Sequence, residues 1–486
     1  MGQSAEYDGL RSFLRACEPL GEVQTVTGAD WNLEIGALTE MVSELIHEPP
    51  ALMFDEISGY AKGFRVLSNP TASRVRMALA LSLPPETSRV DIVRHAAQHI
   101  KKAPPIPPLE VGSGPVMENV MRGDDVDVLK FPVLMAHRND GGRYIGTGDT
   151  LANRDPESGY VNMGTYRMQV HERNLLGLWQ SPGQQGRQIA ERYWKKGESC
   201  PVVATFGGDP LVFTVAHTKF GWGVSELDRV GSVLGHPLPV IRGPLTGLPI
   251  PAHAEIAIEG EIPPPSVESR AEGPFGEWPG YYAASTSTTG DKQPVIRVNA
   301  VYYRNDPILL NMAPQWPGAP HHSVRFAGGV LWEQLESAGI PGIMGVEEHT
   351  HYLVAIAIQQ KYAGHAKQVG MAALGCSAIA RNGRYVVIVD EDIDPANMTE
   401  VMWAMTTRVD PATDIQIVDG CWSTPLDPRM PPDVQKHGPH VNSRAIFYAV
   451  RPWAWKEQFP MVNRIDKDQR EAVLEKYGSM FPFPKR

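Results

Sequence analysis

The chain has 486 residues, of which 42% are apolar and 21% are charged, so we expect a globular protein of about two to four domains. The net charge of −10 and the lack of any lysine- or arginine-rich run argue against a nucleic-acid-binding protein. Four scattered cysteines without a C-x-x-C spacing give no zinc motif, and no apolar run approaches the roughly 20 residues of a membrane span. We therefore expect a cytoplasmic protein with neither a nucleic-acid nor a membrane partner.

The N-terminal part alternates between helical and strand patterns. Its predicted helices cover 8–17, 31–45 and 89–103, and its predicted strands cover 22–27, 51–57 and 64–69. The proline-rich stretch APPIPPLEVGSGP at 103–115 then marks a domain boundary or a linker.

The pattern changes twice further along the chain. From about 125 to 320, short β-rich runs separated by Gly/Pro clusters predict a barrel or mixed sheet, interrupted by a helix at 186–197 and another from Ser225. After 325, predicted helices at 329–339, 366–375 and 397–409 alternate with predicted strands at 351–358 and 384–394. This second pattern is typical of an α/β layer.

Residues 160–172, YVNMGTYRMQVHE, read as one strand that carries Asn162, Arg167 and His171. Because side chains alternate along a strand, Asn162 and Arg167 face opposite sides unless a bulge intervenes. A strand with a solvent-facing arginine explains this segment equally well.

Three further polar groups each allow two interpretations. Glu226 is either a first-turn acid behind an N-capping Ser225 or, with the Asn162 amide, an oxygen ligand for Mg²⁺ or Mn²⁺. Lys367, near the start of a helix, either contacts a phosphate or is solvated. The acid run DEDID at 390–394 either binds a metal or caps a strand end.

The loop EGPFGEWPGYY at 272–282 holds two carboxylates, Glu272 and Glu277, among three glycines and two prolines. Such a constrained backbone suits carboxylates that must be held in a fixed position for proton transfer. Other candidate pocket residues are less specific, and we place Trp316, His321, His322 and Asn442 near a substrate only from their position in the chain.

These motifs occur together in one order. The chain resembles the UbiD-like decarboxylases, which use prenylated flavin mononucleotide, almost from end to end, from DGLRSFLRACEPLGEVQTV to HVNSRAIFYAV. The resemblance implies a mixed α/β fold with three domains. These are an N-terminal α/β domain at 1–115, a flavin-binding split β-barrel at 116–322, and a C-terminal α/β oligomerisation domain with a tail at 323–486.

The resemblance also implies roles for individual residues. Arg167, Glu272 and Glu277 match a catalytic Glu-Arg-Glu network, in which Arg167 pairs mainly with Glu272 while Glu277, with a raised pKa, donates the proton. The implied cofactor-binding residues are Asn162, Arg167, Gln184, Gln185, Glu226 and Lys367, and the implied metal ligands are Asn162, Gln185 and Glu226. Gln185 stands where the family commonly has histidine.

The implied function is reversible, non-oxidative decarboxylation of an aromatic, heteroaromatic or α,β-unsaturated carboxylic acid. The implied cofactors are prenylated FMN, Mn²⁺ or Mg²⁺, and K⁺, with a flavin prenyltransferase as the supplier of the flavin. A homodimer or a higher homo-oligomer is expected. The alternative is a catalytically silent flavin-phosphate-binding protein or an accessory subunit of a decarboxylase complex.

Overall fold

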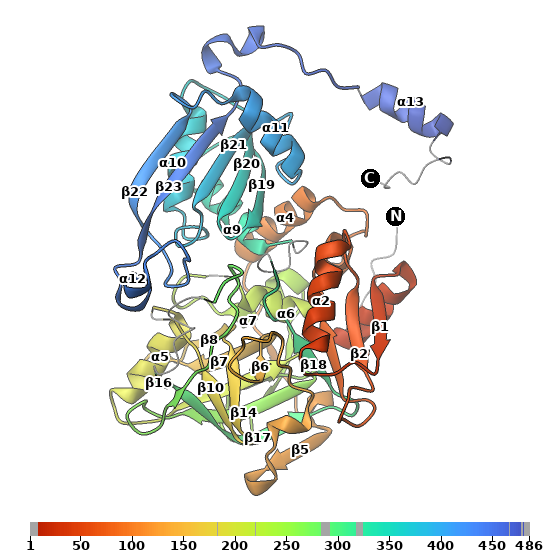
Figure 1. Cartoon of the computed structure of the whole chain (residues 1–486), viewed down its shortest axis with the longest axis vertical. Coiled ribbons are helices and arrows are strands. Elements are labelled where there is room, and N and C mark those ends of the chain that lie inside the picture. Colours follow the sequence, from red (N-terminus) through yellow and green to blue (C-terminus); the bar gives the residue numbers. More distant parts are fainter. Residues whose placement is uncertain are drawn as a thin grey trace.

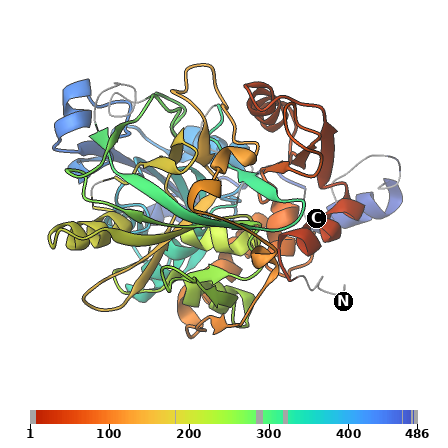
Figure 2. The same ribbon diagram turned by 90° about the horizontal axis from the view of Figure 1, so that it is seen from below.

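The structure is a computed structural model that describes residues 8–181, 183–218, 220–282, 292–316, 324–465, 467–477 and 480. Figure 1 shows a C-terminal sheet at the top, a central sheet at the bottom and the N-terminal elements beside it. Seen from below in Figure 2, the yellow and green strands of the central sheet lie next to the red N-terminal part.

The N-terminal sheet is completed by a strand from much later in the chain. Its order is β1 (Val23–Thr27), β2 (Ala51–Asp55), β3 (Arg65–Ser68) and β18 (Ile308–Asn311), with β18 parallel to β3. The helices of this region are α1 (Leu10–Cys17), α2 (Glu34–Leu45), α3 (Arg74–Ala80) and α4 (Arg89–Ala97). α4 ends in a π-helical turn, Gln98–Lys102, within the range predicted as one helix.

The central sheet is largely antiparallel and curls on itself. Its order is β6 (Tyr144–Gly146), β9 (Met168–Glu172), β10 (Leu175–Leu178), β17 (Val295–Tyr303), β14 (Ile256–Ile262), β11 (Cys200–Phe206), β7 (Asp149–Arg154) and β8 (Val161–Gly164), and β5 (Asn119–Arg122) also pairs with β17. β6 lies at one end of this path and β7 next to the other end, although only two residues separate them in the chain. The sheet therefore forms a half-barrel, which agrees with the predicted barrel or mixed sheet.

Short elements surround the central sheet. The helices are α5 (Gln185–Trp194), α6 (Pro210–Ala216) and α7 (Glu226–Leu234), and the small strands are β4 (Leu109–Glu110), β12 (Pro239–Arg242), β13 (Pro249–Pro251), β15 (Arg270–Ala271) and β16 (Lys292–Gln293). Single 3₁₀ turns cover Glu18–Leu20, Pro115–Met117, Gly123–Asp125 and Val128–Lys130, and a kinked 3₁₀ segment covers Trp453–Gln458.

The single strand predicted at 160–172 is wrong. β8 ends at Gly164 and pairs with β7, whereas β9 starts at Met168 and pairs with β6 and β10. The chain crosses from one end of the curled sheet to the other at 165–167, so strand alternation does not relate Asn162 to Arg167. This crossover removes the objection that the two side chains must face opposite sides.

The C-terminal sheet has the order β19 (Ile343–Thr350), β20 (Leu353–Ile358), β21 (Tyr385–Asp390), β23 (Val441–Ala449) and β22 (Ile415–Trp422). Its helices are α9 (Phe326–Ser337), α10 (His365–Gly375), α11 (Met398–Arg408), α12 (Pro432–His437) and α13 (Lys467–Tyr477). α13 lies apart from the rest at the end of an extended segment (Figure 1). The mixed α/β fold is confirmed, and the domain boundaries stay a prediction.

α4 ties the N-terminal region to the C-terminal sheet. A Cβ on Gly329 of α9 would lie only 2.9 Å from the carbonyl oxygen of Val93, so the two helices cross in close contact. Arg89 at the start of α4 also pairs with Glu347 of β19, at 2.7 Å. Within the described residues, no helix combines the length and the apolar character that a bilayer span requires.

Candidate active site

The two glutamates of the 272–282 loop converge on one buried arginine. The Nε and Nη2 atoms of Arg167 donate to the two carboxylate oxygens of Glu272 at 2.5 and 2.8 Å, and Nη1 donates to Oε1 of Glu277. All three side chains are almost wholly buried. Arg167 thus contacts Glu272 through two hydrogen bonds and Glu277 through one, and we call these three residues the carboxylate–arginine cluster; their catalytic role stays a prediction.

Burial and neighbouring charges shift the pKa values of Glu277 and Arg167 in this cluster. Burial raises the pKa of Glu277, Arg167 opposes that shift, and the negative charge of Glu272 adds to it. Burial lowers the pKa of Arg167, but the charges of Glu277 and Glu272 more than offset this, so its pKa is raised overall. One cation thus faces two carboxylates, and Glu277 is the carboxyl group that tends to retain a proton.

Aromatic rings enclose the guanidinium. The Arg167 Cζ atom lies 4.6 Å from the ring centre of Trp179 and 5.1 Å from that of Phe275. Trp179 is held there because its backbone N–H donates to the Arg167 carbonyl at 3.1 Å. Cation–π contacts and the loss of water around the ion pairs both strengthen the electrostatics of the cluster.

The backbone around Glu272 has no room to shift. A Cβ on Gly141 would overlap the Cα atom of Gly273, and the Gly141 N–H donates to the Pro274 carbonyl at 2.6 Å. The Gly273 N–H donates to Oε1 of Gln169 at 3.0 Å. The glycines of this loop therefore permit a close backbone contact that fixes the two glutamates.

A second cluster forms around the hydroxyl group of Tyr160. This hydroxyl lies 2.8 Å from Oε1 of Gln185 and 3.5 Å from Oε2 of Glu226. Gln185 also donates from Nε2 to the Phe220 carbonyl at 2.9 Å, which turns its amide oxygen toward Tyr160. The same Oε2 of Glu226 accepts from the N–H of Met163, the residue after Asn162, at 2.9 Å.

Asn162 joins this group through Tyr166. The Asn162 side chain hydrogen-bonds the Tyr166 hydroxyl, which also accepts from the Gly186 N–H at 3.2 Å. The structure thus brings together Asn162, Gln185 and Glu226, and we call these three residues the amide cluster. Sequence reasoning missed Tyr160, although Tyr160 and Asn162 are two apart at the start of β8, and period-two spacing could have indicated it.

The first interpretation of Glu226, a first-turn acid behind an N-cap, is correct, and its role as a metal ligand stays a prediction. Glu226 is the first residue of α7 behind Ser225, whose hydroxyl caps the helix by accepting from the Asp228 N–H. It is also buried, and desolvation raises its pKa to about 7. Among the described residues no lysine or arginine pairs with Glu226, so its charge is free to meet another cation.

The donor set of the amide cluster fits a hard divalent cation. Two amide oxygens and one carboxylate match the oxygen ligands preferred by Mg²⁺ and Mn²⁺. In the described part of the chain, no three or more His, Cys, Asp or Glu side chains form a metal-binding group, so amide oxygens are needed at any site here.

Gln184 and Lys367 differ in how they relate to the amide cluster. Gln184 is the N-cap residue of α5, and its side chain makes no cap hydrogen bond to the first turn of that helix, where the Gly186 N–H donates to the Tyr166 hydroxyl. Lys367 lies in the first turn of α10, is exposed, and has its Nζ atom 5.9 Å from the ring centre of Tyr448. Among the described residues, no contact joins Lys367 to the amide cluster.

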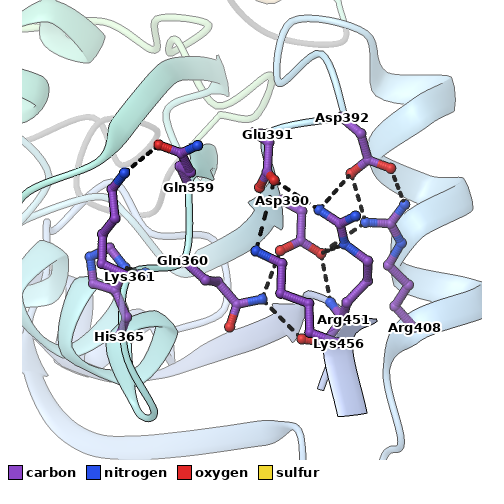
Figure 3. A network of polar contacts seen from close by, with 10 residues as sticks. All are labelled: Gln359, Gln360, Lys361, His365, Asp390, Glu391, Asp392, Arg408, Arg451 and Lys456. Atoms are coloured by element: carbon purple, nitrogen blue, oxygen red, sulfur yellow. Dashed lines mark hydrogen bonds and ion pairs between the residues drawn. The ribbon is translucent and has the colours of Figure 1, made fainter. Parts of the chain in front are cut away.

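The acid run at 390–394 is engaged within the fold. Asp390 accepts from Arg408 at 3.0 Å and from the backbone N–H of Arg451 at 2.6 Å, and Asp392 accepts twice from Arg408 (Figure 3). These contacts attach the segment after β23 to the sheet. The second interpretation, a structural strand end, is therefore correct, and no metal is needed to neutralise these acids.

The remaining pocket candidates contribute little. His321 and His322 lie outside the described residues. Trp316 is exposed, and Asn442 donates to Ser423 and Asp427 within the C-terminal part. Sequence reasoning also missed a contact between the loop and the C-terminal sheet, in which the Trp278 ring lies edge-on against His351, with 4.3 Å between ring centres.

Comparison with known proteins places this geometry in a family. Three family models match, described as the Rift-related domain, the C-terminal domain and the N-terminal domain of 3-octaprenyl-4-hydroxybenzoate carboxy-lyase, UbiD. They cover residues 109–317, 330–449 and 14–96.

Two curated relatives are named decarboxylases. A phenolic acid decarboxylase of Streptomyces sp. (strain D7) is 33% identical, over 92% of this chain and 93% of its own. A pyrrole-2-carboxylic acid decarboxylase of Pseudomonas aeruginosa is 32% identical, over 83% of this chain and 84% of its own.

Solved structures match over nearly the whole chain. The UbiD-class enzyme HmfF of Pelotomaculum thermopropionicum in complex with FMN is 28% identical with a TM-score of 0.82, covering 95% of this chain and 98% of its own. Its evolved dimeric form in complex with prFMN is 27% identical with a TM-score of 0.80, over the same shares.

A vanillic acid decarboxylase of Sedimentibacter hydroxybenzoicus, 28% identical, is known in two forms. The open form has a TM-score of 0.83 and covers 98% of this chain and 99% of its own, and the closed form has a TM-score of 0.80 and covers 98% and 100%. The matched models, the named relatives and these structures agree, and the chain belongs to the UbiD family of carboxy-lyases.

Proposed function

We propose that this carboxy-lyase carries out the reversible, non-oxidative decarboxylation of an aromatic, heteroaromatic or α,β-unsaturated carboxylic acid with the help of prenylated FMN. The observation that carries the proposal is the buried pairing of Arg167 with both Glu272 and Glu277. The named relatives act on phenolic acids and pyrrole-2-carboxylic acid, and a related enzyme has been solved with FMN and with prFMN.

The amide cluster is the proposed holding site for the cofactor phosphate. Asn162, Gln185 and Glu226 offer three oxygen atoms to Mn²⁺ or Mg²⁺, and Gln184 stands beside them at the N-terminus of α5, the end of a helix that favours an anion. Lys367 is exposed here, and its proposed contact with the phosphate is carried over from the resemblance. Involvement of K⁺, and supply of the flavin by a prenyltransferase, are carried over from the resemblance.

When bound, the prenylated flavin would supply an electron sink for the carbon–carbon bond that breaks as CO₂ leaves. The chain's own residues then have to deliver a proton to the carbon left behind. Glu277 is the proposed donor, because burial and the charge of Glu272 raise its pKa while Arg167 opposes the shift. Arg167 compensates the charge of Glu272 and fixes Glu277 by its third hydrogen bond, so the donor stays in place through the reaction.

Two copies of the chain are proposed to meet on the C-terminal sheet. Tyr385 and Ile417 are both in register with Ala445, on the face that α11 covers only in part, and are 43% and 61% exposed. The segment leading to α13 adds Met461, which is 96% exposed. A second copy of the chain would bury both this face and this segment. The test is the molar mass of Ile417→Asp protein measured by light scattering, which should shift toward that of the monomer.

The decisive test of function is a panel of aromatic, heteroaromatic and α,β-unsaturated acids given to protein loaded with prenylated FMN. We expect CO₂ release from at least one member and solvent-deuterium incorporation at the former carboxyl position. The proposal would be contradicted if flavin-loaded protein incorporated no solvent deuterium at the former carboxyl position of any product. The alternative of a silent flavin-binding subunit gains no support, since the chain belongs to a carboxy-lyase family.

A further inference from the structure

The tip of the hairpin between β19 and β20 contacts the loop that carries Glu277. The ring of Trp278, the next residue along that loop, lies 4.3 Å from the ring of His351 and 5.4 Å from that of Tyr352, measured between ring centres. The backbone here forms a tight turn, because the Gly280 N–H donates to the Glu277 carbonyl at 2.8 Å. A shift of the Trp278 ring would therefore displace the backbone of Glu277.

Two charged side chains fix the His351 ring. Nη1 of Arg325 lies 2.7 Å from Nε2 of His351, and Oε1 of Glu348 lies 3.1 Å from Nδ1. A guanidinium can only donate, so Nε2 is the acceptor and the proton of the neutral ring is on Nδ1, which donates to Glu348. Burial and the charge of Arg325 lower the pKa of His351 to about 4, so the ring is neutral at neutral pH. Because both nitrogens are bonded, the ring keeps one orientation toward Trp278.

An arginine of the C-terminal part also holds Tyr352. The Cζ atom of Arg384 lies 4.8 Å from the centre of the Tyr352 ring, and the same guanidinium pairs with the buried Asp427. A guanidinium that is paired with a carboxylate and lies over an aromatic ring restricts the movement of that ring. Both rings that contact Trp278 are thus held by charged residues of the C-terminal part.

Glu277 depends on such an anchor more than Glu272 does. Arg167 donates two hydrogen bonds to Glu272 but only one to Glu277. The close backbone contact at Gly273 fixes the loop beside Glu272. Trp278 is the residue next to Glu277, so its ring contacts fix the loop at the other carboxylate.

We propose that His351 is a positioning residue, which holds Trp278 and thereby keeps the carboxyl group of Glu277 in the place from which it transfers a proton. This inference rests on the proposed function, in which Glu277 is the proton donor. Proton transfer depends steeply on geometry, and a displacement of about 1 Å can cost on the order of 10²-fold in rate. The C-terminal sheet therefore acts on the reaction through Trp278.

The test compares His351→Leu with His349→Leu, in the same hairpin. His349 is also partly buried and bonded, since its Nε2 donates to the Pro395 carbonyl at 2.7 Å, but among the described residues no ring contact or hydrogen bond joins it to Trp278. In His351→Leu, we expect kcat of flavin-loaded protein to fall about 10- to 10²-fold with KM within about twofold of wild type, because only the geometry of proton transfer changes. In flavin-free protein, the amide hydrogens of 277–281 should exchange faster with solvent deuterium. His349→Leu should lower only the Tm.

Trp278→Leu removes the same contact from the loop side and leaves His351 bonded to Arg325 and Glu348, so it should show the same changes even if His351→Leu does not fold. The double variant should be no less active than the less active single variant, because both substitutions remove one contact. Additive losses would overturn the inference, as would wild-type kcat and loop exchange in either single variant, or equal losses of kcat in the two histidine variants. If flavin-loaded wild-type protein decarboxylates no acid, the proposed function fails, whereas loop exchange, measured without flavin, still decides whether His351 holds the loop at Glu277.

Discussion

Exchanging Glu272 for Gln should change the pH dependence of the reaction and not only its rate. The charge of Glu272 helps to raise the pKa of Glu277, and Arg167 lowers it. In Glu272→Gln the first effect disappears, and the guanidinium keeps Glu277 as its only carboxylate partner. Both changes lower the pKa of Glu277, so the acid loses its proton at a lower pH.

The sign follows from the proposed role of Glu277 as the proton donor. In this proposal only the protonated form is active, and its fraction falls tenfold for each pH unit above the pKa. The descending limb of the kcat profile should therefore move to lower pH, with a loss on the order of 10- to 10³-fold at neutral pH that is recovered on acidification. The measurement is kcat against pH for flavin-loaded protein with equal flavin content.

Glu277→Gln serves as the comparison for this experiment. It removes the proposed proton donor itself, so the loss should be about 10²- to 10⁴-fold, or about 3–5 kcal/mol, at every pH. FMN binding should survive in both variants, because neither glutamate belongs to the amide cluster. If Glu272→Gln keeps the wild-type pH limb and loses only amplitude, the division of roles between the two glutamates is refuted.

Further predictions concern cofactor binding and the loop backbone. Glu226→Ala should remain folded but bind little flavin and little Mn²⁺, which absorbance and metal analysis would check, and wild-type occupancy would exclude the metal bridge. Gln185→His should keep or strengthen metal binding, since imidazole is at least as good a Mn²⁺ ligand as an amide, and collapse of metal content would remove Gln185 from the site. Gly141→Ala forces the backbone away from Gly273, so kcat should fall about tenfold or more with FMN affinity retained, and unchanged turnover would show that the loop tolerates displacement.

The local elements could be predicted because their signals are local. Apolar spacing found the helices at 8–17, 89–103 and 397–409, since each has one face buried in the core. The Gly/Pro content of 272–282 indicated a constrained loop, and the close contact of Gly141 with Gly273 accounts for it. The residue types at 167, 272 and 277 suggested the chemistry, and the family resemblance assigned it.

Long-range strand pairing determined the features of the fold that local sequence patterns do not predict. Nothing in the sequence shows that β18 joins the N-terminal sheet beside β3, because the partners are more than 200 residues apart. The strand pattern at 160–172 gave the wrong answer for the same reason. Its two halves have similar local sequence but bind to opposite ends of the curled sheet, and hydrogen bonding to those neighbours, not propensity, ends β8 at Gly164.

The sequence by itself thus determined which residue types could do the chemistry and where the chain turns. Only the tertiary structure decided which of them meet: that Arg167 bonds both glutamates, that Tyr160 links Gln185 to Glu226, that the DEDID acids are neutralised by arginines, and that His351 contacts Trp278. The physical reason is that burial, ion pairing and hydrogen-bond satisfaction depend on neighbours in space. Those neighbours come from segments that no sequence window contains together.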